Sequence, residues 1–390
     1  MPKCMPLKSL HDASESIFAK HICVIKNMTV TMKKRRLLHR FPNLTQMTCC
    51  HSDDEYTTIE NFYLPPLLTV LDMRIKLLSF VTHLNIDNLN QIIRDIVHSS
   101  PRLTTLKLGI KLVCSALDCH RLENEINFLP LMQLQCLTHL SVSCRDTSTA
   151  IVQPRIQSLF YVIQHLRTIQ TLELFTYNPN EHYMNDLEVD ILKHLTLTPP
   201  THITHLNLNH TYLDDEKIAL LQKMPNLTSI TPYAFHTETF DFMKAFPHCT
   251  KFGAYAPEMS ISNFCTNLMT LSQLTDLQMM SECSSADLKR ILAHLPLLQI
   301  LHLLYCDSLE TLDVFPKKSK IGSITIEECN LKHEELASLA SLPHLTHLYV
   351  YDLPYFISPE LYKALCVPST LLPTLTQCVI IKGGEAPLTP

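Results

Sequence analysis

Glycine is scarce in this chain of 390 residues, and its scarcity excludes several kinds of site. Five glycines occur: Gly109, Gly253, Gly322, Gly383 and Gly384. Phosphate-binding loops of the P-loop and Rossmann types need closely spaced glycines, because backbone amides must approach the phosphate. The sequence also lacks the G-x-S-x-G, H-E-x-x-H and C-x-x-C patterns of hydrolases, metalloproteases and redox or zinc sites. We therefore predict no cofactor and no catalytic site: the protein is not expected to be an enzyme.

Long apolar runs and a strong excess of one charge are missing as well. No apolar run approaches the ~20 residues that span a bilayer, and the first residues lack the apolar core of a signal peptide. The formal net charge of −5 gives no reason to expect nucleic acid or an anionic membrane as the partner. We expect a cytoplasmic monomer, and the basic run at residues 33–36 leaves nuclear import as the alternative.

Cysteine is common, but its arrangement does not indicate a disulfide framework. The fifteen cysteines are odd in number and scattered, which favours reduced thiols. Cys249 and Cys378 occupy predicted strand positions, and Cys306 and Cys329 follow predicted strands, so these thiols are expected to be buried as small apolar groups. The densest group of potential ligands is Cys-Cys-His at 49–51, followed by two aspartates. Adjacent cysteines do not match zinc-site spacing, so we predict no metal site.

An internal repeat is the main feature that the sequence does contain. An aliphatic residue, two polar residues, an aliphatic, one polar residue and another aliphatic recur along almost the whole chain. The pattern is plainest as Thr-His-Leu, which begins at Thr82, Thr138, Thr204 and Thr346. From Ile203 to Leu345 the first aliphatic recurs at steps of 24, 22, 25, 24, 23 and 24 residues. A period of about 20–29 residues is typical of leucine-rich repeats.

Each repeat predicts a strand followed by a helix. The alternation of aliphatic and polar residues is that of a strand with one buried face. Apolar residues at helical spacing follow, as in Asp287–Leu295, and a proline often precedes the next strand. These prolines are Pro42, Pro101, Pro225, Pro247, Pro296 and Pro343. One repeat cannot bury its apolar face alone, but a stack can. We predict an α/β solenoid, a horseshoe with parallel strands on the concave face and helices on the convex face.

The spacing is less regular in the N-terminal half. Leu68 and Val81 are only 13 residues apart, so either one is a false match or a very short connection joins them. The units that start at Leu103, Leu137 and Ile169 are longer and need extra helix or loops, near 110–130, 145–158 and 176–190. We predict about 13–14 units over residues 21–381, with a cap at 1–20 and a tail at 382–390.

The repeats resemble a known family. The unit from Ile321 to Leu331 matches the leucine-rich-repeat consensus L-x-x-L-x-L-x-x-C/N-x-L at every anchoring position. Cys306 and Cys329, together with irregular, glycine-poor units, look like the repeats of F-box/leucine-rich-repeat proteins. That resemblance implies a substrate receptor of an SCF-type ubiquitin ligase, with the ligase adaptor bound at the N-terminus. Residues 1–20 would then be a degenerate F-box remnant. The alternative is a repeat-only protein that inhibits or regulates an enzyme or a GTPase.

A protein partner is expected on the concave face. Each predicted strand presents three outward residues, and large apolar or aromatic residues recur at the second and third of these positions. Exposed aromatic and methionine side chains are typical of the cores of protein interfaces. The predicted partner-binding residues are Phe175, Tyr233, Tyr255, Met280, His302, Leu304, Tyr349 and Tyr351.

Overall fold

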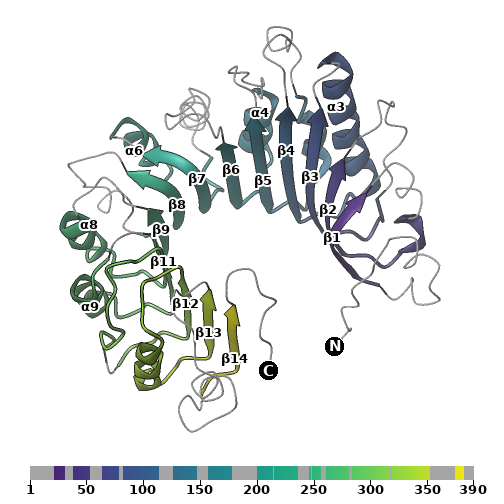
Figure 1. Ribbon diagram of the computed structural model, residues 1–390. Coiled ribbons are helices and arrows are strands. Elements are labelled where there is room, and N and C mark those ends of the chain that lie inside the picture. The colour runs from purple at the N-terminus through teal and green to yellow at the C-terminus, as the bar shows by residue number, and fades with distance from the viewer. Residues whose placement is uncertain are drawn as a thin grey trace. The chain divides into compact units, whose positions relative to one another are not determined.

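The computed structural model has a single sheet in which strand order follows sequence order (Figure 1). It describes residues 22–30, 38–52, 64–78, 82–113, 126–146, 157–177, 200–213, 215–235, 246, 248–255, 261–280, 283–316, 318–351 and 374–381. The sheet has 14 strands. Neighbouring strands pair in parallel from β1 to β7 and from β8 to β14. This order is that of an open leucine-rich-repeat solenoid, which confirms the predicted fold class. The chain divides into two compact units, residues 1–210 and 211–390.

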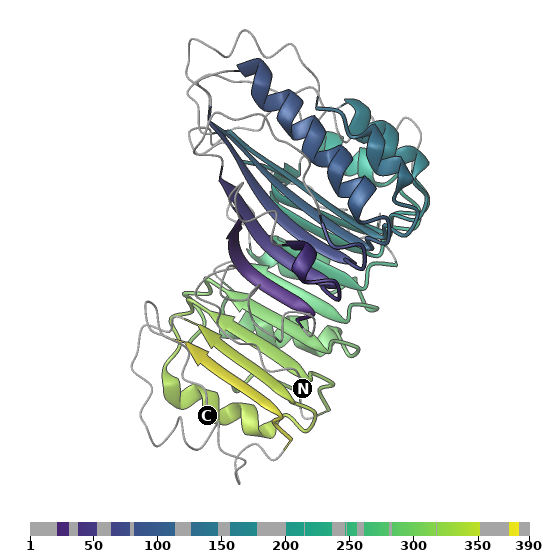
Figure 2. The same ribbon diagram turned by 90° about the vertical axis from the view of Figure 1, so that its right-hand side faces the viewer.

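Unit 1 has the longer strands. They are β1 (Val24–Val30), β2 (Gln46–Ser52), β3 (Val70–Leu78), β4 (Thr105–Val113), β5 (His139–Asp146) and β6 (Thr171–Tyr177). Strand β7 (His205–Leu213) begins in unit 1 and ends in unit 2. Its helices are α3 (Thr82–Ser99) and α4 (Gln157–His165), with short 3-10 helices η2 (Leu38–Arg40) and η4 (Leu129–Gln133). Figure 2 shows α3 and α4 along one face of the unit 1 sheet, which leaves the other face open.

Unit 2 has shorter strands and smaller connecting helices. The strands are β8 (Ser229–Phe235), β9 (Lys251–Tyr255), β10 (Asp276–Met280), β11 (Ile300–Leu304), β12 (Ser323–Glu327), β13 (His347–Tyr351) and β14 (Gln377–Ile381). The helices are α6 (Asp215–Leu221), α8 (Ile261–Leu268), α9 (Ser285–His294) and the 3-10 helix η5 (His333–Ser341). Among the described residues, no helix is both long enough and apolar enough to cross a membrane.

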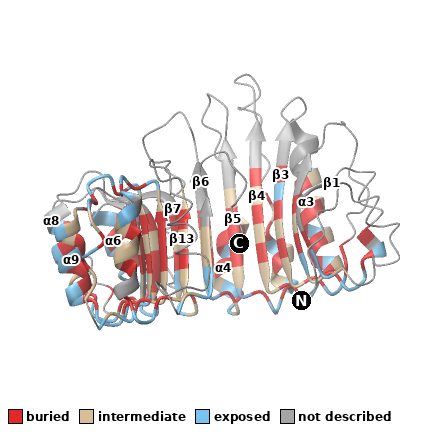
Figure 3. Ribbon diagram, turned by 60° about the horizontal axis from the view of Figure 1, so that its bottom comes forward, coloured by how far each residue is buried: buried red, intermediate tan, exposed pale blue. Residues whose placement is uncertain are grey.

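The core lies between the strands and the connecting segments. Buried and half-buried residues alternate strictly along β11 and β13. The same alternation is present along the first six residues of β4 in unit 1 (Figure 3). In α9, the buried residues Leu288, Ile291 and Leu292 lie at helical spacing, and Ser284 caps the helix by accepting a hydrogen bond from the Asp287 amide. A repeat of this kind therefore contributes one strand face and one helical stripe to the core.

Proline turns precede many of the strands, as predicted. The Leu103 amide donates to the Ser100 carbonyl across Pro101, at 3.2 Å. The Leu298 amide donates to Leu295 across Pro296 in the same way, also at 3.2 Å. Proline suits the second position of such a turn because its φ is already fixed near the required value. The first aliphatic of each repeat is thereby turned into the core.

A ladder of threonines follows these turns. Nine threonines that stand directly after the first aliphatic donate their hydroxyls to the carbonyl of the equivalent residue in the preceding repeat, at 2.9 to 3.4 Å. They are Thr45, Thr69, Thr104, Thr138, Thr204, Thr250, Thr275, Thr346 and Thr376. The same carbonyls also accept two backbone amides from the next repeat. The threonine ladder therefore joins successive repeats at the strand starts.

Two local predictions were wrong. Thr82-His83-Leu84 begins helix α3 rather than a strand, whereas the other three Thr-His-Leu sequences lead into β5, β7 and β13. In addition, the connection from β11 to β12 contains no helix within the described residues 305–316 and 318–322. The long insertions predicted after β4, β5 and β6, and the basic run at 33–36, fall mainly outside the described residues.

Candidate functional site

The open face of each unit is the sheet face opposite the helices, and in-register strands form columns across it. In unit 2, one column contains Tyr255, Met280, Leu304, Glu327 and Tyr351 on successive strands β9 to β13. The neighbouring column contains Gly253, Gln278, His302, Thr325 and Tyr349 on the same strands. The sequence pattern predicted both columns.

The eight predicted partner-binding residues are distributed over both units. Six of them lie in the two columns of unit 2: Tyr255, Met280, His302, Leu304, Tyr349 and Tyr351. Tyr233 lies in β8 of the same unit, and Phe175 lies in β6 of unit 1. The side chains of Phe175, Tyr233, Tyr255 and Met280 are outside the described part of the structure.

The other four side chains are half-buried at outward positions. His302 and Leu304 belong to β11, and Tyr349 and Tyr351 belong to β13. The Tyr349 ring lies beside the His347 ring, with centroids 6.4 Å apart and planes inclined by 19°. Burial raises the pKa of Tyr351, and the nearby Tyr349 and Glu327 raise it further, so its hydroxyl stays neutral. These four residues give the β11–β13 region of the face a mixed aromatic and apolar character.

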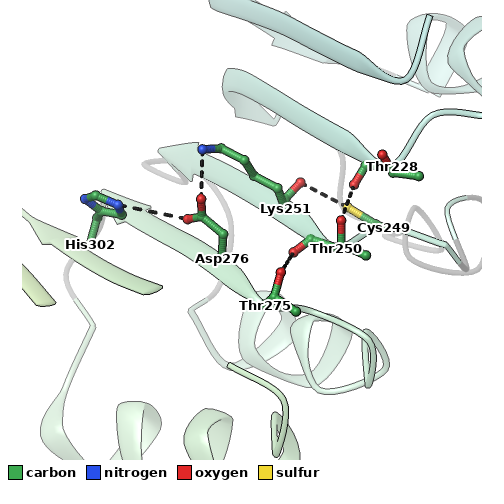
Figure 4. Close-up of polar contacts among 7 residues, drawn as sticks. All are labelled: Thr228, Cys249, Thr250, Lys251, Thr275, Asp276 and His302. Carbon is green, nitrogen blue, oxygen red and sulfur yellow. Dashed lines mark hydrogen bonds and ion pairs between the residues drawn. The ribbon is translucent and has the colours of Figure 1, made fainter. Parts of the chain in front are cut away.

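A polar cluster borders this region on β9 to β11 (Figure 4). The Lys251 Nζ lies 2.8 Å from one Asp276 carboxylate oxygen, and the His302 Nε2 lies 4.0 Å from the other. Burial lowers the pKa of His302, whereas the Asp276 carboxylate opposes that shift. His302 is therefore mainly neutral at pH 7 and adds little positive charge to the face.

The Thr346-His347 pair fixes the imidazole of a second histidine. The Thr346 hydroxyl lies 2.8 Å from His347 Nδ1 and donates its single proton to the Gly322 carbonyl at 2.9 Å. Because the hydroxyl has no other proton to give, Nδ1 must carry a proton and donate to Thr346. In neutral His347 the other nitrogen, Nε2, is then an acceptor. Thr204 and His205 form a similar contact at 2.7 Å in unit 1.

Unit 1 has its own charged cluster, built from the same residue types. Glu173 on β6 lies 3.3 Å from Lys107 Nζ on β4 and 3.3 Å from His139 Nε2 on β5. Burial raises the pKa of Glu173, but the His139 imidazole and the Lys107 charge outweigh burial and lower the pKa to about 2. The Glu173 carboxylate is therefore ionised beside Lys107 and His139, and its proton affinity is too low for proton transfer near neutral pH.

The buried thiols occupy the positions that the sequence predicted. Cys249, Cys306 and Cys329 are buried as expected, whereas Cys378 is only half-buried. The Cys329 thiol donates to the Leu303 and Glu327 carbonyls. Burial raises the pKa of Cys249 to about 12, so this thiol is inert at neutral pH. Among the described residues, no group of three or more histidine, cysteine or acidic side chains could hold a metal ion.

Sequence reasoning missed two parts of the face. Lys251 and Asp276 occupy the first outward position of their strands, where the sequence shows no apolar excess. Tyr305 directly follows β11 and is 41% exposed. Tyr305 lies between Leu304, the last residue of β11, and Cys306. The alternation along the strand therefore did not indicate whether its side chain faces the core or the solvent. The signal that could have found it is an aromatic residue directly before the cysteine of the consensus.

Comparisons with known proteins found only distant structural similarity. No protein-family model and no curated protein matches the chain. Among solved structures, an internalin (inlF) from Listeria monocytogenes aligns over 90% of this chain and 89% of its own, with 14% identity and a TM-score of 0.36. Internalin C2 (inlC2) from the same bacterium aligns over 62% of this chain and 84% of its own, with 15% identity and a TM-score of 0.33.

Similarities at that level carry no functional information. The strand order, register and repeat of the chain itself define its fold as a leucine-rich-repeat solenoid.

Proposed function

We propose that this chain is a non-catalytic recognition module that binds a protein partner on the open face of unit 2. The observation that carries the proposal is the group of His302, Leu304, Tyr349 and Tyr351 at outward positions of β11 and β13. Aromatic side chains bury a large area at little cost in conformational entropy, so they often supply most of the binding energy of an interface. The paired charges beside them suit a polar rim.

The finer role that we propose is substrate recognition for an SCF-type ubiquitin ligase. It is supported by the resemblance of the repeats to those of F-box/leucine-rich-repeat proteins, including buried cysteines at positions 306 and 329. An adaptor-binding segment would lie in residues 1–20, outside the described residues. The alternative is a repeat-only inhibitor or regulator that covers an enzyme or a GTPase with the same face.

The first test removes the aromatic character of the face. We expect a variant with His302→Ser, Tyr349→Ser and Tyr351→Ser to lose partner capture in a pull-down, while its unfolding midpoint stays near that of the wild type. The matched control is Tyr161→Ser with His165→Ser, a stacked pair exposed on helix α4. Capture by the triple variant at wild-type level, with the fold intact, would exclude this face as the binding site.

The second test separates the two finer roles. Deleting residues 1–20 leaves β1 intact, since that strand begins at Val24. If mass spectrometry recovers a ligase adaptor and a cullin with the full chain but not with the deleted chain, the ligase role is supported. Recovery of one enzyme or GTPase by both chains would support the regulator instead.

A further inference from the structure

Five residues of unit 2 meet where strands β11, β12 and β13 end. Glu327 pairs in register with Tyr351. The Tyr305 amide donates to the Glu327 carbonyl at 3.0 Å, and the Glu328 amide donates to the Tyr351 carbonyl at 3.1 Å. Tyr349 lies two residues before Tyr351 on the same face of β13. We call Tyr305, Glu327, Glu328, Tyr349 and Tyr351 the tyrosine–glutamate surface.

Tyr305 is exposed in an unusual backbone conformation. Its φ is 55°, and that of Glu328, the equivalent residue of the next repeat, is 47°. Left-handed backbone is normally occupied by glycine, asparagine or aspartate, because a larger side chain crowds its own carbonyl there. A bulky aromatic at such a site does not improve the fold, and its ring is 41% exposed. A function on the surface accounts better for this side chain.

The two loops that follow β11 and β12 are strongly acidic. Segments 305–313 and 327–335 contain seven carboxylates and one lysine, a formal charge of −6, compared with −5 for the whole chain. The carboxylates are Asp307, Glu310, Asp313, Glu327, Glu328, Glu334 and Glu335. The loops lie side by side, since Glu335 accepts hydrogen bonds from the Thr311 hydroxyl and the Leu312 amide. Negative charge is therefore concentrated in the two loops that begin at Tyr305 and Glu327.

Nearby basic groups do little to offset this charge. His302 has a lowered pKa because it is partly buried. Lys318 and Lys320 precede β12, at the strand end opposite to Glu327. The surface thus combines aromatic faces and carboxylates.

That combination fits an arginine side chain. A guanidinium ion stacks on tyrosine rings and donates paired hydrogen bonds to a carboxylate. Lysine offers neither the planar group nor the paired donors. A nucleic-acid backbone would be repelled by the acidic loops, because phosphate carries negative charge.

We propose that the tyrosine–glutamate surface binds an arginine-rich segment of the protein partner. This inference rests on the proposed recognition function and specifies the partner's chemistry at that site. It assigns Glu327 and Glu328 to charge pairing and Tyr305, Tyr349 and Tyr351 to stacking.

The experiment uses the full chain and a fluorescent peptide in which arginine alternates with glycine and serine. Matched peptides carry lysine or glutamate in place of arginine, and binding is followed by fluorescence anisotropy at two salt concentrations. We expect the arginine peptide to bind most tightly, the glutamate peptide not to bind, and affinity to fall with salt. Glu327→Gln with Glu328→Gln should weaken arginine-peptide binding about tenfold.

Tyr305→Gly distinguishes binding from folding. Because glycine accepts the left-handed backbone, this variant should unfold at the same denaturant concentration as the wild type, or a higher one, yet bind the arginine peptide about threefold more weakly. Tyr161→Ser and Asp215→Asn, both exposed on helices, are the matched controls and should leave binding unchanged. A well-folded Tyr305→Gly variant with full affinity would contradict the role of Tyr305.

The outcomes also separate this inference from the proposed function. Equal binding of the arginine and glutamate peptides, or an unchanged affinity after the double glutamate substitution, overturns the arginine proposal. Suppose that the arginine proposal is overturned but the His302→Ser, Tyr349→Ser, Tyr351→Ser variant still fails to capture a protein partner. The recognition function is then supported, and only the proposal that the partner's segment is arginine-rich is wrong.

Discussion

At the scale of single residues, the most strongly perturbed carboxyl group on the described open faces is Glu173. It shows how side chains of neighbouring strands can hold a charge on a half-buried face. Lys107 and His139, on two neighbouring strands, hold it ionised against the effect of burial. The sequence could place Glu173 at an outward strand position. It could not show this pairing, because Lys107 and His139 come from different repeats and meet only through strand register.

The depressed pKa of Glu173 predicts a defined pH dependence of stability. The pKa is lowered from 4.5 to about 2 in the folded chain, so the ionised group stabilises the fold above pH 4.5, and this contribution is lost as the pH falls toward 2. Glu173→Gln should therefore cost up to about 3 kcal/mol at pH 7 and progressively less below pH 4.5. Urea unfolding of both proteins between pH 7 and pH 3 measures this difference.

The exposed Glu310 provides the control for that measurement. Glu310→Gln should give a small difference from the wild type with little dependence on pH. If the cost of Glu173→Gln is the same at pH 7 and pH 3, the ion pairs with Lys107 and His139 do not stabilise the folded chain.

At the scale of elements, strands were predictable and connecting segments were less so. The strand pattern is repeated in every unit, so a wrong strand prediction affects one segment only. Thr82-His83-Leu84 matches three residues of the pattern, but a stripe of apolar residues at helical spacing follows it. Leu89, Ile92, Ile93 and Ile96 in that stripe are buried, and this spacing fixes α3 as a helix. The same spacing at Leu288, Ile291, Leu292 and Leu295 correctly predicted α9.

The β11–β12 connection has no such stripe. Between Cys306 and Ile321, which are also buried, the buried residues are Leu309, Leu312 and Val314. Their steps of three and then two positions do not continue along one face of a helix. The chain therefore fills the core with turns in this repeat. Tyr305 was missed for a related reason: its direction depends on a backbone conformation that the period does not specify.

The threonine ladder predicts a stability effect that is common to the strand starts. Thr275→Val removes the hydroxyl bond to the Thr250 carbonyl, at 3.0 Å, and should cost about 1 kcal/mol, because that carbonyl keeps its two backbone donors. Gln299 occupies the next step of the ladder, where Gln299→Thr should add a similar bond and stabilise the chain by about 0.5 kcal/mol. Urea unfolding tests both changes. A neutral Thr275→Val, or a destabilising Gln299→Thr, would show that the hydroxyls are not part of the joint between repeats.

At the scale of the whole molecule, the period was the strongest information in the sequence. It predicted a parallel solenoid in which strand order follows chain order, as observed. The partner is far less predictable, because binding depends on which outward residues meet across repeats, and these positions are free to vary without harm to the core. The β11–β13 region illustrates this: its aromatic columns follow from the repeat, but its acidic character appears only when adjacent loops are placed side by side.

The most direct test of the recognition proposal is site-specific photocrosslinking. A photoreactive phenylalanine analogue would replace Tyr349 on the open face or, in a control protein, Tyr161 on helix α4. After irradiation with the captured partner, we predict a covalent adduct from position 349 and none from position 161. An adduct from position 161 alone would show that the partner binds the helical side and would contradict the account.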